Sequence, residues 1–252
     1  EYQKASVEFK NYINKNPENK VKLDDSYLRM ADTYFVSSDY QNAIKTYDII
    51  IQNKSADADY AQFQKAVSYG YIGQDEQKIE ELITFLRRYK KSAYKYDTYY
   101  VLANEYVDAN ETELALEKYD YLINNISRST LAKKAMLKKG AIYYNSDANE
   151  KALSTYKRVV DQYPNTAEAK QAVSSARQIY VDLGRVDEYA SWVKTIDFIN
   201  VTDAELDNDM FESAERQYLQ GNHLKAISGF KKYLENFSNG LNALHVNFYL
   251  AQ

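Results

Sequence analysis

Few residues of this 252-residue chain have the types and spacing that catalysis or metal binding requires. The two histidines, His223 and His245, have no second histidine and no cysteine at a metal-ligand spacing, so we expect no zinc site. Gly70 and Gly73 lack the Lys-Ser/Thr pair that completes a phosphate-binding loop, and no Gly-x-Ser-x-Gly nucleophile motif occurs. Carboxylates are plentiful, but such side chains on helix surfaces are usually solvated. The sequence therefore predicts a protein that is not an enzyme and needs no cofactor.

Charges of both signs are mixed along the chain, with 36 acidic and 32 basic residues and a formal net charge of −4. Nucleic-acid binding normally needs a pronounced basic field. The densest basic run, Arg87, Arg88, Lys90, Lys91 and Lys95, lies where a helix should end, and cations there complement the helix dipole. No apolar run approaches the ~18–20 residues of a membrane span. We therefore expect no nucleic-acid partner and no membrane span, and the lack of cysteine excludes disulfides and thiol chemistry.

The elements that position the side chains are predicted by a repeat in the sequence. Equivalent positions of successive repeats are 35 residues apart in the first interval and 37 residues apart in all later ones. We call one such position the mark of the repeat; it is a small residue with one exception: Ala31, Ala66, Ala103, Gly140, Arg177, Ala214 and Ala251. Every other position is counted from the mark of its repeat, so that position +3 of the first repeat is Tyr34. A period between 20 and 50 residues indicates a solenoid.

Four further positions of the repeat carry recurring residue types. Position +3 is tyrosine in five repeats: Tyr34, Tyr69, Tyr106, Tyr143 and Tyr180. Position +7 is glycine or a small polar residue, where a left-handed turn is needed: Ser38, Gly73, Asn110, Asp147, Gly184 and Gly221. Position +12 is alanine in Ala43, Ala115, Ala152 and Ala226, and position +16 is large and apolar in Tyr47, Leu82, Tyr119, Tyr156, Val193 and Phe230. Apolar residues at three- and four-residue spacing between these points predict pairs of helices that cross closely at the mark and at +12.

These residues resemble the tetratricopeptide repeat, a helix–turn–helix unit of about 34 residues. Residues 25–55 and 135–164 carry nearly the full pattern. The resemblance implies an all-α, right-handed superhelical solenoid of antiparallel helix pairs. The longer spacing and endings such as DQYPNTAEA look like a subset found in bacterial envelope proteins. That likeness implies a location in the periplasm or cell envelope, with the cytoplasm as the alternative.

The whole chain, 1–252, is expected to form a single solenoid of fourteen helices. The six full repeats are expected at 24–58, 59–95, 96–132, 133–169, 170–206 and 207–240. Residues 1–18, with Ala5, Phe9, Tyr12 and Pro17, match a second helix without its first, and residues 243–252 match a first helix without its second. The chain is therefore interpreted as a fragment of a longer array whose end helices invite end-to-end self-association.

Two repeats depart from the pattern. Arg177 replaces the small residue of its mark, and Lys78 replaces the alanine at +12. We expect the helices of these two repeats to be splayed or rotated, because a bulky side chain forces the backbones apart.

In tetratricopeptide proteins the first helix of each pair lines a concave groove, to which positions −3, +1 and +4 contribute. The groove that this resemblance implies for a protein or peptide partner comprises Leu28, Phe35, Phe63, Tyr100, Asn104, Lys134, Leu137, Lys138, Tyr144, Phe211 and Tyr218. Some family members hold a partner's C-terminal carboxylate with lysine and asparagine. Asn104 with Lys134 and Lys138 resembles that clamp incompletely, because Tyr100 stands where its first lysine belongs.

The leading hypothesis is a non-catalytic scaffold that binds a segment of another protein through aromatic and aliphatic anchors. Two alternatives remain: a structural spacer or self-assembly element of a larger envelope protein, and recognition of glycan or peptidoglycan by a tyrosine-rich groove. The same apolar side chains could instead be covered by the next repeat. The sequence leaves the identity of the partner open.

Overall fold

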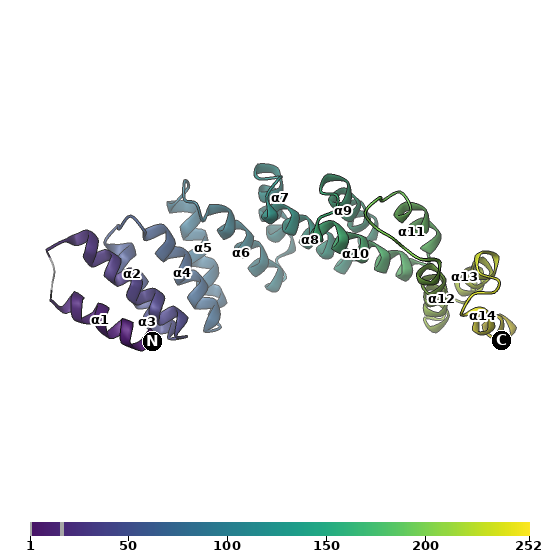
Figure 1. The fold of residues 1–252 in the computed structure, drawn as a ribbon, viewed down its shortest axis with the longest axis horizontal. Coiled ribbons are helices and arrows are strands. Elements are labelled where there is room, and N and C mark those ends of the chain that lie inside the picture. Colours follow the sequence, from purple (N-terminus) through teal and green to yellow (C-terminus); the bar gives the residue numbers. More distant parts are fainter. Residues whose placement is uncertain (1, 16–17) are drawn as a thin grey trace. The chain divides into compact units, whose positions relative to one another are not determined.

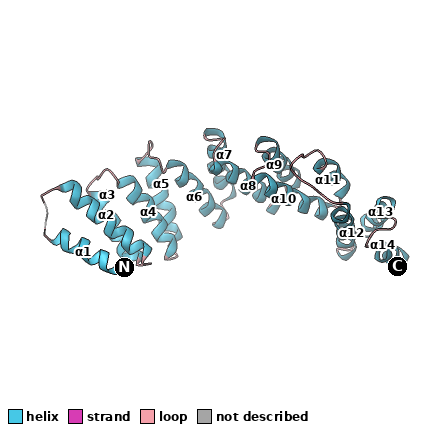
Figure 2. Cartoon of the chain, in the orientation of Figure 1, coloured by secondary structure: helices cyan, strands magenta, loops and turns pink. Residues whose placement is uncertain are grey.

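The computed structural model describes residues 2–15 and 18–252, and in that part of the chain every regular element is an α-helix (Figures 1 and 2). The helices are α1 (Tyr2–Asn14), α2 (Lys20–Val36), α3 (Tyr40–Gln52), α4 (Ala58–Tyr71), α5 (Asp75–Arg88), α6 (Lys95–Asp108), α7 (Thr112–Asn125), α8 (Thr130–Asn145), α9 (Asn149–Gln162), α10 (Ala167–Leu183), α11 (Val186–Val193), α12 (Asp203–Leu219), α13 (His223–Asn236) and α14 (Ala243–Ala251). The all-α prediction is confirmed. Pro17 and the side chain of Ala5 lie outside the described residues.

The chain divides into two compact units, Glu1–Ser127 and Arg128–Gln252. The first unit contains α1 to α7 and the second contains α8 to α14. Within each unit consecutive helices pack as hairpins that stack on their neighbours, which is the arrangement of a helical solenoid. First helices begin one to four residues before the expected repeat boundaries, as α2 and α12 show.

Helix starts and turns explain these boundaries. Asn19, Ser129 and Thr166 accept hydrogen bonds from the first turns of α2, α8 and α10, and Thr202 forms a capping box with Glu205. The turn residues at +7 all have positive φ, between 56° and 78°, in Ser38, Gly73, Asn110, Asp147, Gly184 and Gly221. The predicted left-handed turn is therefore confirmed in every full repeat.

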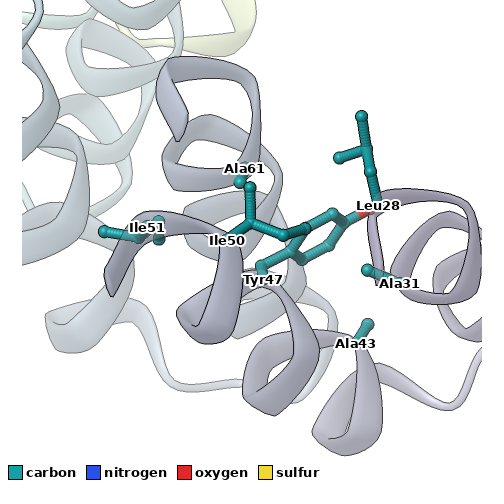
Figure 3. Close-up of a cluster of buried hydrophobic side chains, with 7 residues drawn as sticks. All are labelled: Leu28, Ala31, Ala43, Tyr47, Ile50, Ile51 and Ala61. Carbon is teal, nitrogen blue, oxygen red and sulfur yellow. The ribbon is translucent and has the colours of Figure 1, made fainter. Parts of the chain in front are cut away.

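The core lies where the mark, +12 and +16 residues meet. In the first repeat, Ala31, Ala43 and Tyr47 have no solvent exposure, and the Tyr47 ring lies among these alanines, Leu28 and Ala61 (Figure 3). In the fourth repeat the helices approach so closely that a Cβ atom at Gly140 would lie 2.5 Å from Cε1 of Tyr156. Small marks therefore permit the close crossing that the repeat predicts.

The two irregular repeats accommodate their large side chains in different ways. A Cβ atom at Gly70 would lie 2.9 Å from Lys78 Cδ, so the lysine stem lies directly across α4. Its Nζ atom then reaches Glu105 Oε1 on α6, 2.5 Å away. In the repeat of Arg177 the second helix, α11, has only eight residues, and residues 194–202 form no helix.

The basic run from Arg87 to Lys95 does not lie entirely at the end of one helix, as the sequence suggests. Helix α5 ends at Arg88, and Lys95 is the first residue of α6.

Candidate partner-binding surfaces

Two of the predicted groove residues are buried in the core. Leu28 packs with Ala31 and Tyr47, and Leu137 on α8 is buried as well. Both stand at position −3 on the first helix of their repeat, α2 or α8, among the buried residues of that helix. These side chains stabilise the fold and offer no surface to a partner, so their placement in a groove is corrected.

Three aromatic groove residues are half-buried in ring stacks. Phe63 stacks on Tyr94 with 5.8 Å between ring centroids and meets Phe85 edge-on. Tyr100 meets the Tyr119 ring edge-on, and burial raises the pKa of its hydroxyl. Phe211 lies against Phe230, His245 and Tyr249. Their rings are engaged within the fold, so their removal would disturb packing before it tested binding.

The residues of the incomplete carboxylate clamp are divided between the two units. Asn104 belongs to the first unit, and its Oδ1 atom already accepts a hydrogen bond of 2.6 Å from the Tyr119 hydroxyl. Lys134 and Lys138 are exposed on α8, in the second unit. Neither unit by itself therefore presents the combination of asparagine and lysine that a carboxylate clamp requires.

The remaining predicted residues of the second unit belong to polar contacts made within the fold. The Tyr144 hydroxyl donates to Asp182, which holds the pKa of Tyr144 up at about 12, with burial adding to the effect. Asp182 also accepts from Arg216 and, over 2.9 Å, from Gln178 Nε2, while Arg216 pairs with Glu212 at 2.6 Å. Tyr218 donates to Gln252 Oε1 over 3.0 Å. We call Tyr144, Gln178, Asp182, Glu212 and Arg216 the Asp182 network.

The first unit instead exposes a group of apolar side chains where α2, α3 and α4 meet. Tyr40 and Tyr71 stack almost parallel, with centroids 4.7 Å apart and planes inclined by 5°, and Phe35 meets both rings edge-on at 5.6 Å. Tyr71 is 61% exposed and Val36, the last residue of α2, is 55% exposed. We call Phe35, Val36, Tyr40 and Tyr71 the aromatic patch.

Only Phe35 of the aromatic patch was predicted from the sequence. Val36 and Tyr71 both stand at position +5, one residue beyond the predicted +4 position. Positions +1 and +5 are one helical turn apart and lie on the same face, so the helix period could have identified them. The exposure of both side chains was the part that the sequence did not reveal.

A polar network supports the first unit close to this patch. Asp32 Oδ1 accepts hydrogen bonds from the hydroxyls of Tyr47, at 2.7 Å, and Tyr60, at 3.1 Å. Burial, followed by the Asp32 charge, raises the pKa of Tyr60 to about 12. The hydrogen bond from Tyr47 to Asp32 recurs as that from Tyr119 to Asn104, at the same two repeat positions. This bond ties the first helix of a repeat to its second helix.

Neither a metal site nor a membrane-spanning helix occurs in the part of the chain that the structure describes. Across residues 2–15 and 18–252, no group of three or more His, Cys, Asp or Glu side chains is arranged to hold a metal ion. In the same ranges no helix combines the length and apolar character that crossing a membrane requires.

Comparisons with known proteins agree with the repeat. A family model described as "Tetratricopeptide repeat" matches residues 134–166, which contain nearly all of the α8–α9 hairpin. No curated protein sequence matches the chain. The solved structures with a similar fold include a tetratricopeptide repeat protein from Parabacteroides merdae ATCC 43184, with a TM-score of 0.57 and 14% identity over 99% of this chain and 91% of that one.

Two further solved structures share the fold. The MamA protein has a TM-score of 0.54 and 18% identity, over 79% of this chain and 94% of MamA. A chain of the APC/C hetero-tetramer has a TM-score of 0.50 and 14% identity, over 100% of this chain and 46% of that one. At these identities the likeness concerns the fold. The family model shows a tetratricopeptide repeat at residues 134–166, and the left-handed turns at +7, the close crossings at the marks and the likeness in fold identify the chain as a helical solenoid of the tetratricopeptide-repeat type.

Proposed function

We propose that this chain is a non-catalytic scaffold that holds a segment of another protein against the aromatic patch of its first unit. The observation that carries the proposal is the exposure of Val36 and of Tyr71, whose ring is stacked on Tyr40. Aromatic side chains supply much of the energy of protein interfaces, and clustered exposed apolar side chains commonly mark such surfaces.

The patch is suited to binding because its rings are already ordered. Tyr71 is stacked on Tyr40, and Phe35 supports both rings from the side. A partner that covers them would lose little side-chain entropy on the scaffold's side of the interface. The favoured partner segment is apolar or aromatic, because no basic side chain belongs to the patch. A subunit of the APC/C hetero-tetramer provides a precedent for this fold within an assembly.

The proposal is tested by comparing captured proteins. The double variant Val36→Ser, Tyr71→Ser should lose its partner while keeping its helical circular dichroism. The control, Ile83→Ser with Leu114→Ser, changes two exposed apolar residues on the second helices α5 and α7 of the same unit. A protein that the wild type and the control capture from an extract of the source organism, but the patch variant does not, supports the proposal. Equal capture by all three chains contradicts it.

The glycan alternative concerns the same rings, because exposed aromatic faces can also stack on sugars. Titration with glycan fragments, with tyrosine fluorescence as the readout, distinguishes a glycan ligand from a protein partner. Saturable binding of a fragment that the patch variant abolishes would replace the protein partner by a glycan. The cell envelope, with the cytoplasm as the alternative, remains the predicted compartment.

Self-association is a second candidate function, favoured by exposed apolar residues on α14 and in the loop before it. Leu241, Leu244 and Phe248 are all largely exposed, and the last two lie on α14. Light scattering over a concentration series would detect association, and Leu244→Ser with Phe248→Ser should suppress it. A strictly monomeric wild type would remove this candidate.

A further inference from the structure

The second unit contains a cleft that the repeat pattern does not predict. It has a volume of about 370 Å³ and is bordered by the start of α11 on one side and by α12 and α13 on the other. Met210, Ala214 and Gly229 supply small or apolar lining. Leu224, Lys225 and Lys232 line it from α13, and Asp187 faces them from α11.

The cleft exists because two aromatic side chains of the preceding repeat are replaced here by glutamine and glycine. In the repeat of Arg177, positions +3 and +15 are Tyr180 and Trp192, whose ring centroids lie 6.4 Å apart. In the repeat of Ala214 the same positions are Gln217 and Gly229, and both line the cleft. Position +3 is tyrosine in each of the five preceding repeats. The space that an aromatic pair fills in one repeat is therefore left open in the next.

Glycine at position 229 is also required because α13 packs closely on α12 at this point. A Cβ atom there would lie 2.9 Å from the Cβ atom of Ala214, closer than side chains normally approach. The close crossing of α12 and α13 thus forms an apolar surface of small residues at the cleft. Such a surface accommodates an apolar side chain that inserts from outside.

The rim combines an exposed leucine with lysines. Leu224 stands at +10 and is 86% exposed. The equivalent residues of the other five full repeats are all polar: Gln41, Glu76, Glu113, Glu150 and Asp187. Lys225 is exposed, and Lys232 Nζ lies 3.2 Å from Asp187 Oδ2 with both side chains about half exposed. An exposed pair of this kind is held weakly and exchanges readily with a carboxylate of a partner.

We propose that this cleft binds an apolar side chain of a partner polypeptide whose neighbouring residues are acidic. The apolar side chain would lie on Met210, Ala214 and Gly229, beside Leu224, and the carboxylates would meet Lys225 and Lys232. The charge of the lysines and the apolar lining together select this partner over a basic or wholly polar one. The site is independent of the aromatic patch, because it lies in the other unit and shares no residue with the patch.

The methionines provide a direct test, because the chain contains three and only Met210 lines the cleft. Met30 and Met136 are buried in helices of the first and second unit and serve as internal references. The full chain, labelled with ¹³C at its methionine methyl groups, is titrated with the acetylated and amidated peptide Gly-Glu-Glu-Leu-Glu-Glu-Gly. We expect a saturable shift of the Met210 signal, with the signals of Met30 and Met136 unchanged.

Matched variants separate a specific cleft from general charge attraction. Lys225→Glu with Lys232→Glu should weaken binding of the peptide by about tenfold or more, since two attractive contacts become repulsive. Lys231→Glu changes an exposed lysine of the same helix that does not line the cleft and should leave the affinity unchanged. A control peptide with lysine in place of every glutamate should not shift Met210.

Three results would overturn the proposal. These are an unmoved Met210 signal at millimolar peptide, equal binding of the acidic and basic peptides, and equal weakening by the Lys231 variant and the double variant. Ser228→Trp places a large side chain into the cleft from an exposed helical position. It should abolish the shift with the thermal midpoint retained, so persistence of the shift in this folded variant would also contradict the proposal.

Discussion

Positions +4 and +5 carry different chemistry in the first two repeats, which belong to the first unit, and in the fourth and fifth repeats, which belong to the second. In the first unit, Phe35 at +4 and Val36 and Tyr71 at +5 form an apolar surface that water contacts. In the second unit, Tyr144 at +4 and Asp182 at +5 are joined within the Asp182 network. The repeat therefore determines where a side chain lies but leaves its chemistry free to differ.

This difference decides which surface is available to a partner. Covering the aromatic patch releases water from apolar surface, which is favourable. A partner that covered the Asp182 network would have to remove the charges of Asp182, Glu212 and Arg216 from water, which costs free energy even when they are paired. At these positions, polar groups that are satisfied within the chain stabilise the second unit, whereas the first unit leaves apolar side chains in contact with water, which favours the proposed partner surface.

The largest loss of stability is expected from breaking the ion pair between Arg177, the one mark that is not a small residue, and Asp209 in the second unit. Arg177 Nε donates to Asp209 Oδ2 over 2.7 Å, and the Asp209 side chain has no solvent exposure. Arg177→Ala leaves that carboxylate buried without its ion-pair partner and should lower the free energy of unfolding by about 3 kcal/mol. This is the lower end of the range for buried pairs, because the Arg177 side chain is 41% exposed. Urea denaturation followed by circular dichroism measures the loss. If the single variant were as stable as the wild type, the mark would not depend on this pair.

The regular marks of the first unit should respond to added volume. Ala103 has no solvent exposure where α6 crosses α7, so Ala103→Leu should overpack the hairpin and cost roughly 1–3 kcal/mol. The same denaturation experiment measures it. Ala109→Leu, on the exposed residue that follows α6, is the matched control and should change stability little. Equal effects of the two substitutions would mean that the mark is not a close crossing.

Replacing the central aspartate of each polar network by alanine should destabilise the two units to different extents. Asp32→Ala removes the acceptor of two tyrosine hydroxyls, and the Tyr47 side chain is fully buried, so a cost of about 1–2 kcal/mol is expected. Asp182→Ala should cost less, because Arg216 and Tyr144 are partly exposed and can bind water instead. A larger loss for Asp182→Ala than for Asp32→Ala would reverse the comparison.

Alkaline pH should reveal the same networks. Tyr60 and Tyr144 each have a pKa raised to about 12, whereas tyrosines in the unfolded chain ionise near 10. Their contribution to stability is thus fully present below pH ~10 and is lost as the pH rises through about 12. Tyr60→Phe should reduce the slope of stability against pH in that window, as thermal melts at several pH values would measure. An unchanged slope would contradict the shifted pKa of Tyr60.

The sequence predicted the parts of this fold that depend on local chemistry and period. Ser38 and Asp147 could be assigned to left-handed turns because glycine occupies the same place in other repeats. Leu28 was misplaced, because an apolar residue at position −3 serves core or groove equally well until its neighbours are known. The partner of Arg177, Asp209, lies 32 residues away on another hairpin, and no spacing rule relates them.

The missed parts of the surface have a related cause. Exposure of Tyr71 depends on which side chains surround it in three dimensions, and its stacking on Tyr40 joins two different hairpins. In the sequence the cleft at Gly229 is indicated only by the loss of aromatic residues at +3 and +15, once the repeat is aligned with that of Tyr180 and Trp192. Comparison of repeats within one chain is therefore the sequence signal that could have identified it.

Photo-crosslinking from equivalent positions of the two units tests the central claim most directly. A photoreactive phenylalanine analogue replaces Tyr71 in one chain and Asn145 in another, since both residues occupy position +5 of their repeats and both are exposed. Each chain is irradiated in an extract of the source organism, and covalent adducts are identified by mass spectrometry. We predict a discrete protein adduct from position 71 and none of comparable yield from position 145. Equal adducts from both positions, or none from position 71, would contradict the assignment of partner binding to the aromatic patch.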